Sequence, residues 1–502
     1  MIEIIAQIND KISKVVWGTP ALTLLIGTGV LLTLLTKGFQ FTHFFYTLRK
    51  TVGSLPKGSP GKRPDSHTQV AAEGKSISQF QALCTALSAT IGTGNISGIA
   101  YAITIGGPGA IFWMWIATLA GMITAFAEKV LGIYFRRRNA EGEWCGGAMY
   151  YLEYGLGRKK GCKTLGKVLA LLFALFTMLA SFGIGNLSQI ASIRETIFSL
   201  TSFTGILKVD SFILGVVAAV AAAFVILGGL SRIAKANETL VPFMAGFYIL
   251  GALIIIFSHK ELIIPAFASI LKHAFSLQAA VGGTGGFLLK QAITCGFKRG
   301  VFSNEAGMGS SVIVHATADV REPVEQGLWG IFEVFFDTIL ICTLTALVIL
   351  TSGLVDLDTG LALTESTSLS LATEAFCSSF GLAGGIFMTV AVTLFAFATI
   401  LGWNFYGAKA CEYLLGTKAV TLYKYIYIAV ILLGCTLNVD LIIALSDTFN
   451  GLMAIPNLIG VLSLTGTVMA ILNNYKRRVF KGERIKPMLS YFPEIEKEQR
   501  GR

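Results

Sequence analysis

Long uncharged blocks dominate this sequence. Ser76–Ala127 runs for 52 residues without an Asp, Glu, Lys or Arg, and Ala375–Ala408 runs for another 34. Two shorter blocks, Trp17–Thr36 and Val168–Ile193, are also free of charge. A bilayer core needs about 20 apolar residues per helix, so each longer block holds either several spans or one span with a broken middle. The pattern predicts an all-α polytopic membrane protein.

Apolar runs and turn signals predict eleven membrane helices. The predicted spans are residues 17–36, 78–104, 108–135, 164–192, 211–231, 238–258, 280–318 (interrupted), 327–354, 382–406, 421–438 and 441–474. We group them into an N-terminal span with its connection (1–77), two five-helix repeats (78–258 and 280–474) and a C-terminal tail (475–502). No small-residue cleavage site follows the first apolar run, so we predict a retained span rather than a signal peptide.

The distribution of basic residues predicts the orientation. With these spans, 29 Lys and Arg fall on the side that carries the C-terminal tail and 6 fall on the other side. The connection 355–381, on that second side, has four carboxylates and no base. Because loops rich in Lys and Arg stay in the cytoplasm, we expect the N-terminus outside the cell and the C-terminus in the cytoplasm.

The composition argues against several other classes of protein. The formal net charge is +11, but the bases lie between apolar blocks rather than on one face of a soluble domain, so we expect no nucleic-acid partner. The eight cysteines form no C-x-x-C pair and the five histidines lie mostly in or near connections, so disulfides and a zinc site are not expected. We expect no cofactor and no catalytic centre.

The first predicted break lies at Ser88–Gly98, SATIGTGNISG, inside the longest uncharged block. Each glycine weakens a helix by about 1 kcal/mol relative to alanine. Unwound backbone in a bilayer is tolerated only where protein or water satisfies it. We therefore predict a helix interrupted for binding. The alternative is that the glycines only allow close helix packing, but packing leaves Thr93 and Asn95 unexplained.

A second break is predicted about two hundred residues later. The string GGTGGFLLKQAITCGFKRGVFSNEAGMGSS combines glycines with Lys298, Arg299 and Glu305. Charges at membrane depth cost several kcal/mol, about 3 or more, unless they are paired or hydrated, so they indicate a cavity or a gate. The alternative is an ion pair of these residues at the cytoplasmic end of the span.

The two breaks occupy matching positions in two groups of five spans. Since five is odd, the groups insert with opposite topology, which is typical of inverted-repeat transporters. Half-helix N-termini then offer N–H groups to an anion, and half-helix C-termini offer carbonyls to a cation. An amino-acid carboxylate and Na+ suit those two ends.

Three strings, SATIGTGNISGIAYAITIGGPGAIFWMW, RGVFSNEAGMGSS and ATILGWNFYG, resemble the bacterial and archaeal alanine or glycine:cation symporter family. The resemblance extends from the first span to about residue 480. It implies a LeuT-like 5+5 inverted repeat preceded by one extra helix. It also implies Na+-coupled uptake of alanine or glycine by alternating access in a bacterial or archaeal cell membrane. Val312 and Val314 depart from the family pattern. We expect a monomer in the lipid bilayer.

The resemblance also implies a substrate site. The substrate carboxylate would lie near Gly92, Thr93, Gly94 and Asn95, with the Asn95 amide as a donor. Gln189 would hold the amino group through its carbonyl, unless it serves as a helix-to-helix hydrogen bond. Trp403 would wall off the side-chain end, unless it belongs to an interfacial belt.

For sodium, the resemblance implies four oxygen ligands at the end of the first half-helix and on the ninth span. They are the carbonyls of Ser88, Ile91 and Ala396 and the hydroxyl of Thr399. The alternative for Thr399 is a hydrogen bond to its own helix.

A rival interpretation is a proton-coupled carrier that uses Glu333, Asp337 or Asp447. Glu333 and Asp337 are spaced i, i+4 and should share a helix face, although pairing with a base is the simpler expectation for Glu333. Glu128 and Lys129 are expected to snorkel at the end of the third span. We assign no role to Glu305.

Overall fold

The structure is a computed structural model that describes residues 2–54, 76–204, 210–275, 285–436 and 440–501. The first half contains α1 (Ile2–Val16), α2 (Thr19–Thr36), α3 (Phe39–Thr42), α4 (Phe44–Lys50), η1 (Val52–Ser54), α6 (Gln79–Thr90), η2 (Gly94–Gly98), α7 (Ile99–Gly106), α8 (Gly109–Tyr134), α9 (Ala148–Tyr154), η3 (Leu156–Arg158), α10 (Lys163–Phe182), η4 (Gly183–Leu187), α11 (Ser188–Thr204), α12 (Ser211–Ile226) and α13 (Gly229–Ser258). A two-residue hairpin of β1 (Arg137–Arg138) and β2 (Trp144–Cys145) follows α8.

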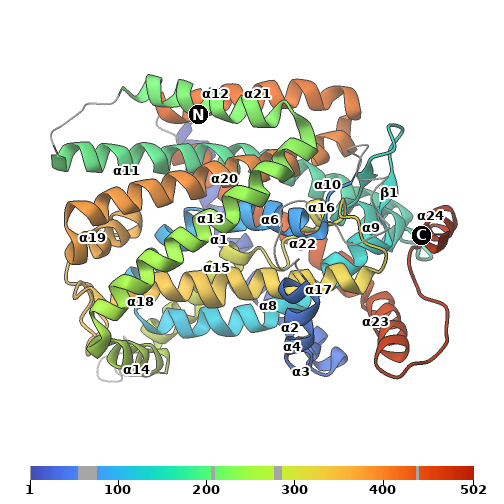
Figure 1. The fold of residues 1–502 in the computed structure, drawn as a ribbon, viewed down its shortest axis with the longest axis horizontal. Coiled ribbons are helices and arrows are strands. Elements are labelled where there is room, and N and C mark those ends of the chain that lie inside the picture. The colour runs from blue at the N-terminus through green and yellow to red at the C-terminus, as the bar shows by residue number, and fades with distance from the viewer. Residues whose placement is uncertain (1, 55–75, 205–209, 276–284, 437–439, 502) are drawn as a thin grey trace.

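The second half is also helical (Figure 1). It contains η5 (Lys260–Leu262), α14 (Ile263–Ala274), α15 (Gly285–Asn304), α16 (Val312–His315), α17 (Pro323–Val334), η6 (Phe335–Cys342), α18 (Thr343–Thr351), α19 (Ser368–Phe380), α20 (Leu382–Leu415), α21 (Thr417–Thr436), α22 (Asp440–Ser463), α23 (Thr465–Val479) and α24 (Pro493–Gly501). The segments η2, η4 and η6 are π-helical.

Helix ends follow local signals in the sequence. At the start of α6, the Ser78 hydroxyl accepts from the Gln81 N–H at 3.0 Å while the Gln81 side chain accepts from the Ser78 N–H, which is a capping box. Pro323 opens α17, where its missing N–H costs nothing. Gly416 ends α20 with a positive φ of 85°.

Seven helices of the described residues are long and apolar enough to cross a membrane. They are Glu3–Thr36, Gly109–Tyr134, Lys163–Leu200, Gly229–Ser258, Pro323–Thr351, Leu382–Leu415 and Thr417–Cys435. The pair Ile443–Ser463 and Thr465–Val479, bent by 57°, gives up to eight. The prediction of an all-α polytopic membrane protein is confirmed. The count of eleven spans, the LeuT-like repeat and the domain boundaries remain predictions.

Both predicted interruptions are present. In the first, α6 ends at Thr90 and η2 begins only at Gly94. In the second, α15 ends at Asn304, and α16 does not begin until Val312. Glu305 has a positive φ of 53° within that second break. Gly282 and Gly283, which the sequence places before α15, lie outside the described residues.

Helix α8 organises the core around these breaks. It packs against α15 and α17, and α15 in turn packs against α7 of the first broken span. Gly132 on α8 faces Val312, and a Cβ at Gly132 would lie 2.2 Å from a Val312 methyl carbon. The fully buried Val312 is therefore accommodated by a glycine on its neighbour.

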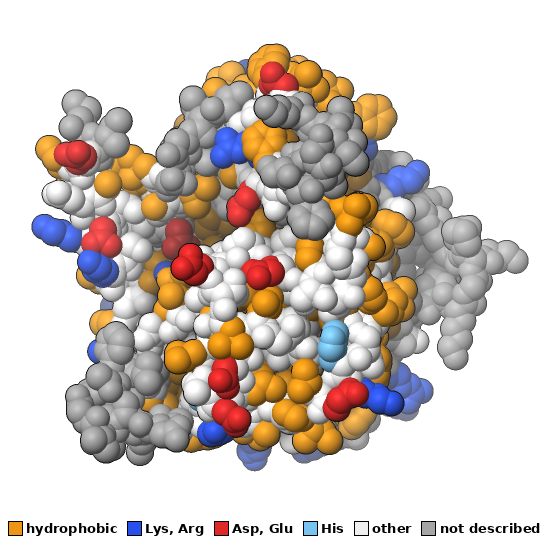
Figure 2. Space-filling view, turned by 90° about the vertical axis from the view of Figure 1, so that its left-hand side faces the viewer, with side chains coloured by type: hydrophobic (Ala, Val, Ile, Leu, Met, Phe, Trp, Pro, Cys, Tyr) orange, Lys and Arg blue, Asp and Glu red, His pale blue; other side chains and the backbone are white. Residues whose placement is uncertain are grey.

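The two ends of the molecule differ in charge. The C-terminus, α9, the β1–β2 hairpin and α24 gather at one end (Figure 1). We call it the basic end because it carries Arg137 and Arg138 of β1 and the run Arg158–Lys160 after α9. At the opposite end lie α14 and α19, and Figure 2 shows acidic side chains across the centre of that face. This separation agrees in direction with the charge bias of the sequence, but the orientation in a membrane remains a prediction.

Candidate functional site

The first break leaves main-chain polar groups without helical partners. Among the described residues, the N–H groups of Thr93 and Gly94 have no hydrogen-bond acceptor, and the carbonyls of Ala89 and Ile91 have no donor. Thr93 and Ile91 are nevertheless buried. Buried backbone groups are nearly always paired in proteins. The break is therefore an arrangement of donors and acceptors that a ligand could satisfy.

The four predicted sodium ligands belong to two elements that meet at this break. The Thr399 hydroxyl oxygen lies 2.9 Å from the Ser88 carbonyl and 2.9 Å from the Phe395 carbonyl of its own helix. Ala396 lies one turn before Thr399 on α20. The structure thus places Thr399 between the predicted partner and the predicted alternative, and brings it to the end of α6.

The predicted substrate residues of the break lie close to Gln189. The Thr93 hydroxyl donates to the Gln189 side-chain carbonyl at 3.1 Å, and the Gln189 amide donates to the Ile184 carbonyl at 2.9 Å. A Cβ at Gly92 would lie 2.7 Å from the Thr399 hydroxyl oxygen and 3.6 Å from the Gln189 carbonyl oxygen. Only glycine at position 92 leaves room between these two groups.

Asn95 has its hydrogen-bonding capacity engaged inside the protein. Its side-chain carbonyl accepts from the Gly92 N–H at 3.0 Å. Its amide donates to Asp337 at 2.7 Å and to the Ser303 hydroxyl at 3.0 Å. Asn95 therefore links the first break to the end of α15 and to η6. An amide held in this way would have to leave Asp337 to donate to a substrate.

Asp337 is a buried carboxylate beside the first break. It accepts from Asn95, from the Ser303 hydroxyl at 2.7 Å and from the Thr338 hydroxyl at 2.8 Å. No ion pair of Asp337 occurs within the part of the chain that the structure describes. From the sequence, Asp337 was predicted to act only in the rival, proton-coupled mechanism. The signal in the sequence was an acidic residue within an apolar span. The spacing of residues along the chain did not indicate that Asn95 and Ser303 would be its hydrogen-bond partners.

Trp403 is fully buried in the middle of α20. A Cβ at Gly185 would lie 2.2 Å from the Trp403 Cβ, so η4 and α20 are in direct contact there. The interfacial-belt alternative does not fit a residue with no exposed surface. The Trp403 indole N–H has no partner among the described residues, so a donor remains available in this region.

A second buried cluster joins α8, α16 and α17. Lys129 lies 3.2 Å from Glu333 and donates to the Ser311 hydroxyl at 2.7 Å, and His315 lies 3.1 Å from Glu333. Glu128 is fully buried and accepts from the Asn457 amide at 2.5 Å. The expectation that Glu128 and Lys129 snorkel is wrong, because both side chains face this polar cluster instead of the surface.

Glu333 and Asp337 do not form a pair, although they are four residues apart. Glu333 contacts Lys129 and His315, whereas Asp337 contacts Asn95 and Ser303. The chain changes from α-helix to π-helix at Phe335. The wider π-turn changes the α-helical spacing between the two residues, and each carboxylate has its own set of partners.

The remaining predicted charges have local partners. Lys298 lies 3.8 Å from Asp447. The Ser310 hydroxyl donates to Glu305. The alternative of an ion pair among Lys298, Arg299 and Glu305 is therefore wrong: Glu305 is bonded within its own break and the Lys298 partner lies on α22.

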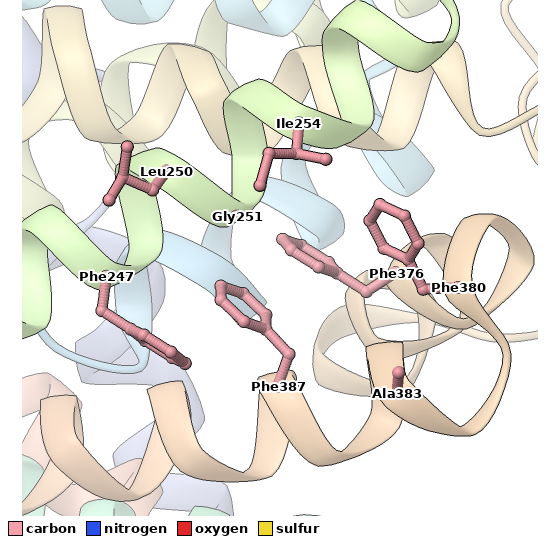
Figure 3. Close-up of a pocket in the computed structure, with 8 residues that line it drawn as sticks. All are labelled: Phe247, Leu250, Gly251, Ile254, Phe376, Phe380, Ala383 and Phe387. Carbon is pink, nitrogen blue, oxygen red and sulfur yellow. The ribbon is translucent and has the colours of Figure 1, made fainter.

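A cavity of about 310 Å³ lies away from these residues, between α13, α19 and α20 (Figure 3). Its lining is apolar and consists of Phe247, Leu250, Gly251, Ile254, Phe376, Phe380, Ala383 and Phe387. Such a surface offers no group for a charged ligand. The described residues also contain no group of three His, Cys, Asp or Glu that could hold a metal ion.

Comparison with known proteins identifies the family of this chain. Residues 2–488 match the model of the sodium:alanine symporter family. The sodium/alanine symporter AgcS of Methanococcus maripaludis is 43% identical over 92% of this chain and 95% of its own length. The probable sodium/glutamine symporter GlnT of Bacillus subtilis is 35% identical over 96% and 93%. A solved Na+-coupled sialic acid symporter is 14% identical, with a TM-score of 0.47 over 95% of this chain and 94% of that one. The chain therefore belongs to the sodium:alanine symporter family and is a multi-pass transporter of a prokaryotic membrane that couples sodium to amino-acid symport.

Proposed function

We propose that this protein imports small neutral amino acids, alanine or glycine or both, together with Na+ by alternating access. The observation that carries the proposal is the first break. Within the described part of the chain it leaves unpaired N–H groups at Thr93 and Gly94 and unpaired carbonyls at Ala89 and Ile91, and all of these residues except the half-buried Gly94 are buried. Oppositely polarised groups at adjacent half-helix ends suit a zwitterion and a cation bound together.

We place Na+ among the carbonyls of Ser88, Ile91 and Ala396 and the hydroxyl of Thr399. The 2.9 Å between the Thr399 hydroxyl and the Ser88 carbonyl supports this assignment, since it sets two hard oxygens side by side. When Na+ binds, the hydroxyl would turn its proton to the Phe395 carbonyl, which lies at an equal 2.9 Å. The lone pairs of the Thr399 hydroxyl oxygen and of the Ser88 carbonyl oxygen would then face the ion.

The substrate would lie on the other side of the break. The free N–H groups of Thr93 and Gly94 would hold its carboxylate, and the Gln189 carbonyl would accept from its ammonium group. Close packing around the break supports a substrate with a small side chain. A Cβ built at Gly94 would lie 3.8 Å from the Phe302 ring, and Trp403 packs directly against Gly185. Every extra methylene would need volume that such walls do not offer.

The energy available matches concentrative uptake. One charge crossing 100 mV contributes about 2.3 kcal/mol, and a tenfold Na+ gradient adds about 1.4 kcal/mol. Together they sustain accumulation of a few hundredfold, on the order of 10² to 10³, per sodium. We infer that the two broken spans, α8 and the span Pro323–Thr351 rock against the remaining helices. We also infer that the basic end lies in the cytoplasm, that the N-terminus lies outside, and that one chain suffices.

The proton-coupled alternative rests on three carboxylates, and two of them already have basic partners. Glu333 faces Lys129 and His315, and Asp447 faces Lys298. Each of these two carboxylates therefore already forms an ion pair inside the protein. Only Asp337 lacks an ionic partner in the described part of the chain, so the alternative reduces to this residue.

The test is uptake of radiolabelled alanine and glycine into proteoliposomes, with either an imposed Na+ gradient or an imposed proton gradient. We expect uptake to follow Na+ and to be indifferent to protons. Uptake driven by protons without Na+ would contradict the proposal. A binding screen with D-alanine, L-alanine, glycine, serine and glutamine, each with and without Na+, defines the substrate range.

A further inference from the structure

The C-terminal tail folds back onto the basic end of the molecule. Residues 489–501, here called the tail, include α24 and lie against the β1–β2 hairpin and α9 (Figure 1). The family match ends at residue 488. The tail therefore lies beyond the region shared with the family model, and nothing in the transport cycle proposed above uses it.

The tail is bound by apolar packing and by a helix cap. Phe492 and Ile495 are buried against Trp144 of β2. The Tyr491 N–H donates at 2.9 Å to the carbonyl of Tyr134, the last residue of α8. The final carbonyls of a helix have no partner within the helix, so the tail satisfies one at the end of α8. Glu498 adds a 2.9 Å ion pair to Arg138.

Underneath the tail lies Arg136, a fully buried arginine. Its guanidinium donates to three carbonyls of the segment after α16: Ala316 at 3.2 Å, Ala318 at 2.6 Å and Val320 at 2.7 Å. It also stacks 3.9 Å from the centre of the Trp144 ring. The Gln499 side chain, with its amide oxygen toward the guanidinium, accepts at 3.1 Å. Gln499 is 1% exposed, so the tail completes the enclosure of this charge.

The segment held by Arg136 also holds the start of α6. Residues 316–320 form a parallel bridge with Ile77, in which the Ile77 N–H donates to the Thr317 carbonyl at 3.3 Å and the Asp319 N–H donates to the Ile77 carbonyl at 2.7 Å. Ile77 lies directly before the capping box of α6. One continuous set of contacts therefore runs from the tail through Arg136 to the basic end of the first half-helix.

We propose that the tail is a clamp that holds the basic end of α6 closed, and that its release frees this half-helix to move about the break at residues 91–93. The proposal rests on the alternating-access function above only for its consequence, which is control of opening toward the basic end. The contacts themselves need no substrate. A buried guanidinium is costly to leave without acceptors, so Arg136 ties the clamp and the segment after α16 into one unit.

The test compares backbone hydrogen exchange in the full-length protein with Phe492→Ala/Ile495→Ala and in a matched control, Glu494→Ala/Lys497→Ala, whose side chains are exposed on the same helix. We expect exchange at residues 76–82 and 316–320 to rise about tenfold in the first variant, which corresponds to about 1.4 kcal/mol of lost clamp stability. The control should match the unsubstituted protein.

Labelling of the native Cys84 provides a second readout. This thiol is buried on α6 and becomes accessible only if the half-helix moves. A membrane-impermeant maleimide is applied from the side of the basic end, in a Cys145→Ser/Cys162→Ser background that removes the thiol beside Trp144 and the half-buried thiol at position 162. We expect about tenfold faster modification of Cys84 in the tail variant.

The outcomes separate the clamp from simple tail packing. Faster exchange confined to residues 489–501, or unchanged labelling of Cys84, overturns the proposal. If the double variant also loses protection from exchange along α8, the same two readouts are measured in Gln499→Ala. This variant removes only the amide that faces Arg136, so its result then decides whether the clamp exists. Because neither readout needs an amino acid or Na+, failure of the proposed transport function would leave this result interpretable.

Discussion

Thr399→Val is the substitution that most directly tests the proposed sodium site. Valine keeps the branched shape at Cβ and removes only the hydroxyl. That hydroxyl lies 2.9 Å from the Ser88 carbonyl, at the end of α6 where the helix has lost its regular bonds. A hydrogen bond or ligand contact to a charged group contributes about 1.5–3 kcal/mol. The concentration of Na+ that gives half-maximal uptake should therefore rise about 10- to 100-fold.

The assay is the initial rate of alanine uptake into proteoliposomes as a function of external Na+. The matched control is Thr393→Val on the same helix, because the Thr393 hydroxyl only donates to the Thr389 carbonyl one turn earlier, at 2.7 Å. The control should leave the Na+ dependence unchanged. If Thr399→Val lowers the melting temperature while the Na+ dependence stays that of the unsubstituted protein, the hydroxyl is a structural group and the sodium assignment is refuted.

Three further substitutions test the surroundings of the site. Gly185→Ala would place a Cβ 2.2 Å from the Trp403 Cβ. Overpacking of this kind costs about 1–3 kcal/mol, so we expect a lower melting temperature and weak alanine uptake, and normal values for both would contradict the contact. Asp337→Ala leaves three buried donors without their acceptor, each at about 1–3 kcal/mol, and should unfold at lower temperature than Asp337→Asn, which keeps one oxygen. Lys129→Met leaves Glu333 with only His315 as a basic partner and should destabilise by about 3 kcal/mol or more. Lys129→Met/Glu333→Leu should recover most of that loss in a thermal unfolding assay, and no recovery would argue against the pair.

The breaks could be predicted from the sequence because their chemistry is local. Glycines that bracket Thr93 in an uncharged block already conflict with a regular membrane helix, and the structure interrupts α6 within that string. The capping box at Ser78 is likewise a local pattern. The prediction of a broken helix therefore needed no knowledge of what surrounds it.

The partners of the buried charges could not be predicted in the same way. Lys129 and Glu333 are about two hundred residues apart in the chain, and the snorkelling prediction assumed that Lys129 faces outward. The π-helix at Phe335 removed the other available guide, because α-helical spacing no longer relates Glu333 to Asp337. The tail was similarly missed, since a short charged C-terminal segment gives no sequence signal for burial against Trp144.

Asn95 gives the two breaks a common mechanical element. Its side-chain carbonyl is bonded to the Gly92 N–H in the first break, while its amide is bonded to Ser303 near the second break and to Asp337 on η6. A cation that draws in the Ser88 and Ile91 carbonyls would shift Gly92, and Asn95 would transmit that shift to Ser303 and Asp337. A hydrophobic contact tolerates such a displacement, but a buried hydrogen bond is lost steeply with distance and angle. Sodium bound at the end of α6 would therefore change the hydrogen bonds at the end of α15 through the Asn95 side chain. Symport requires such a coupling between the ion and the moving half-helices.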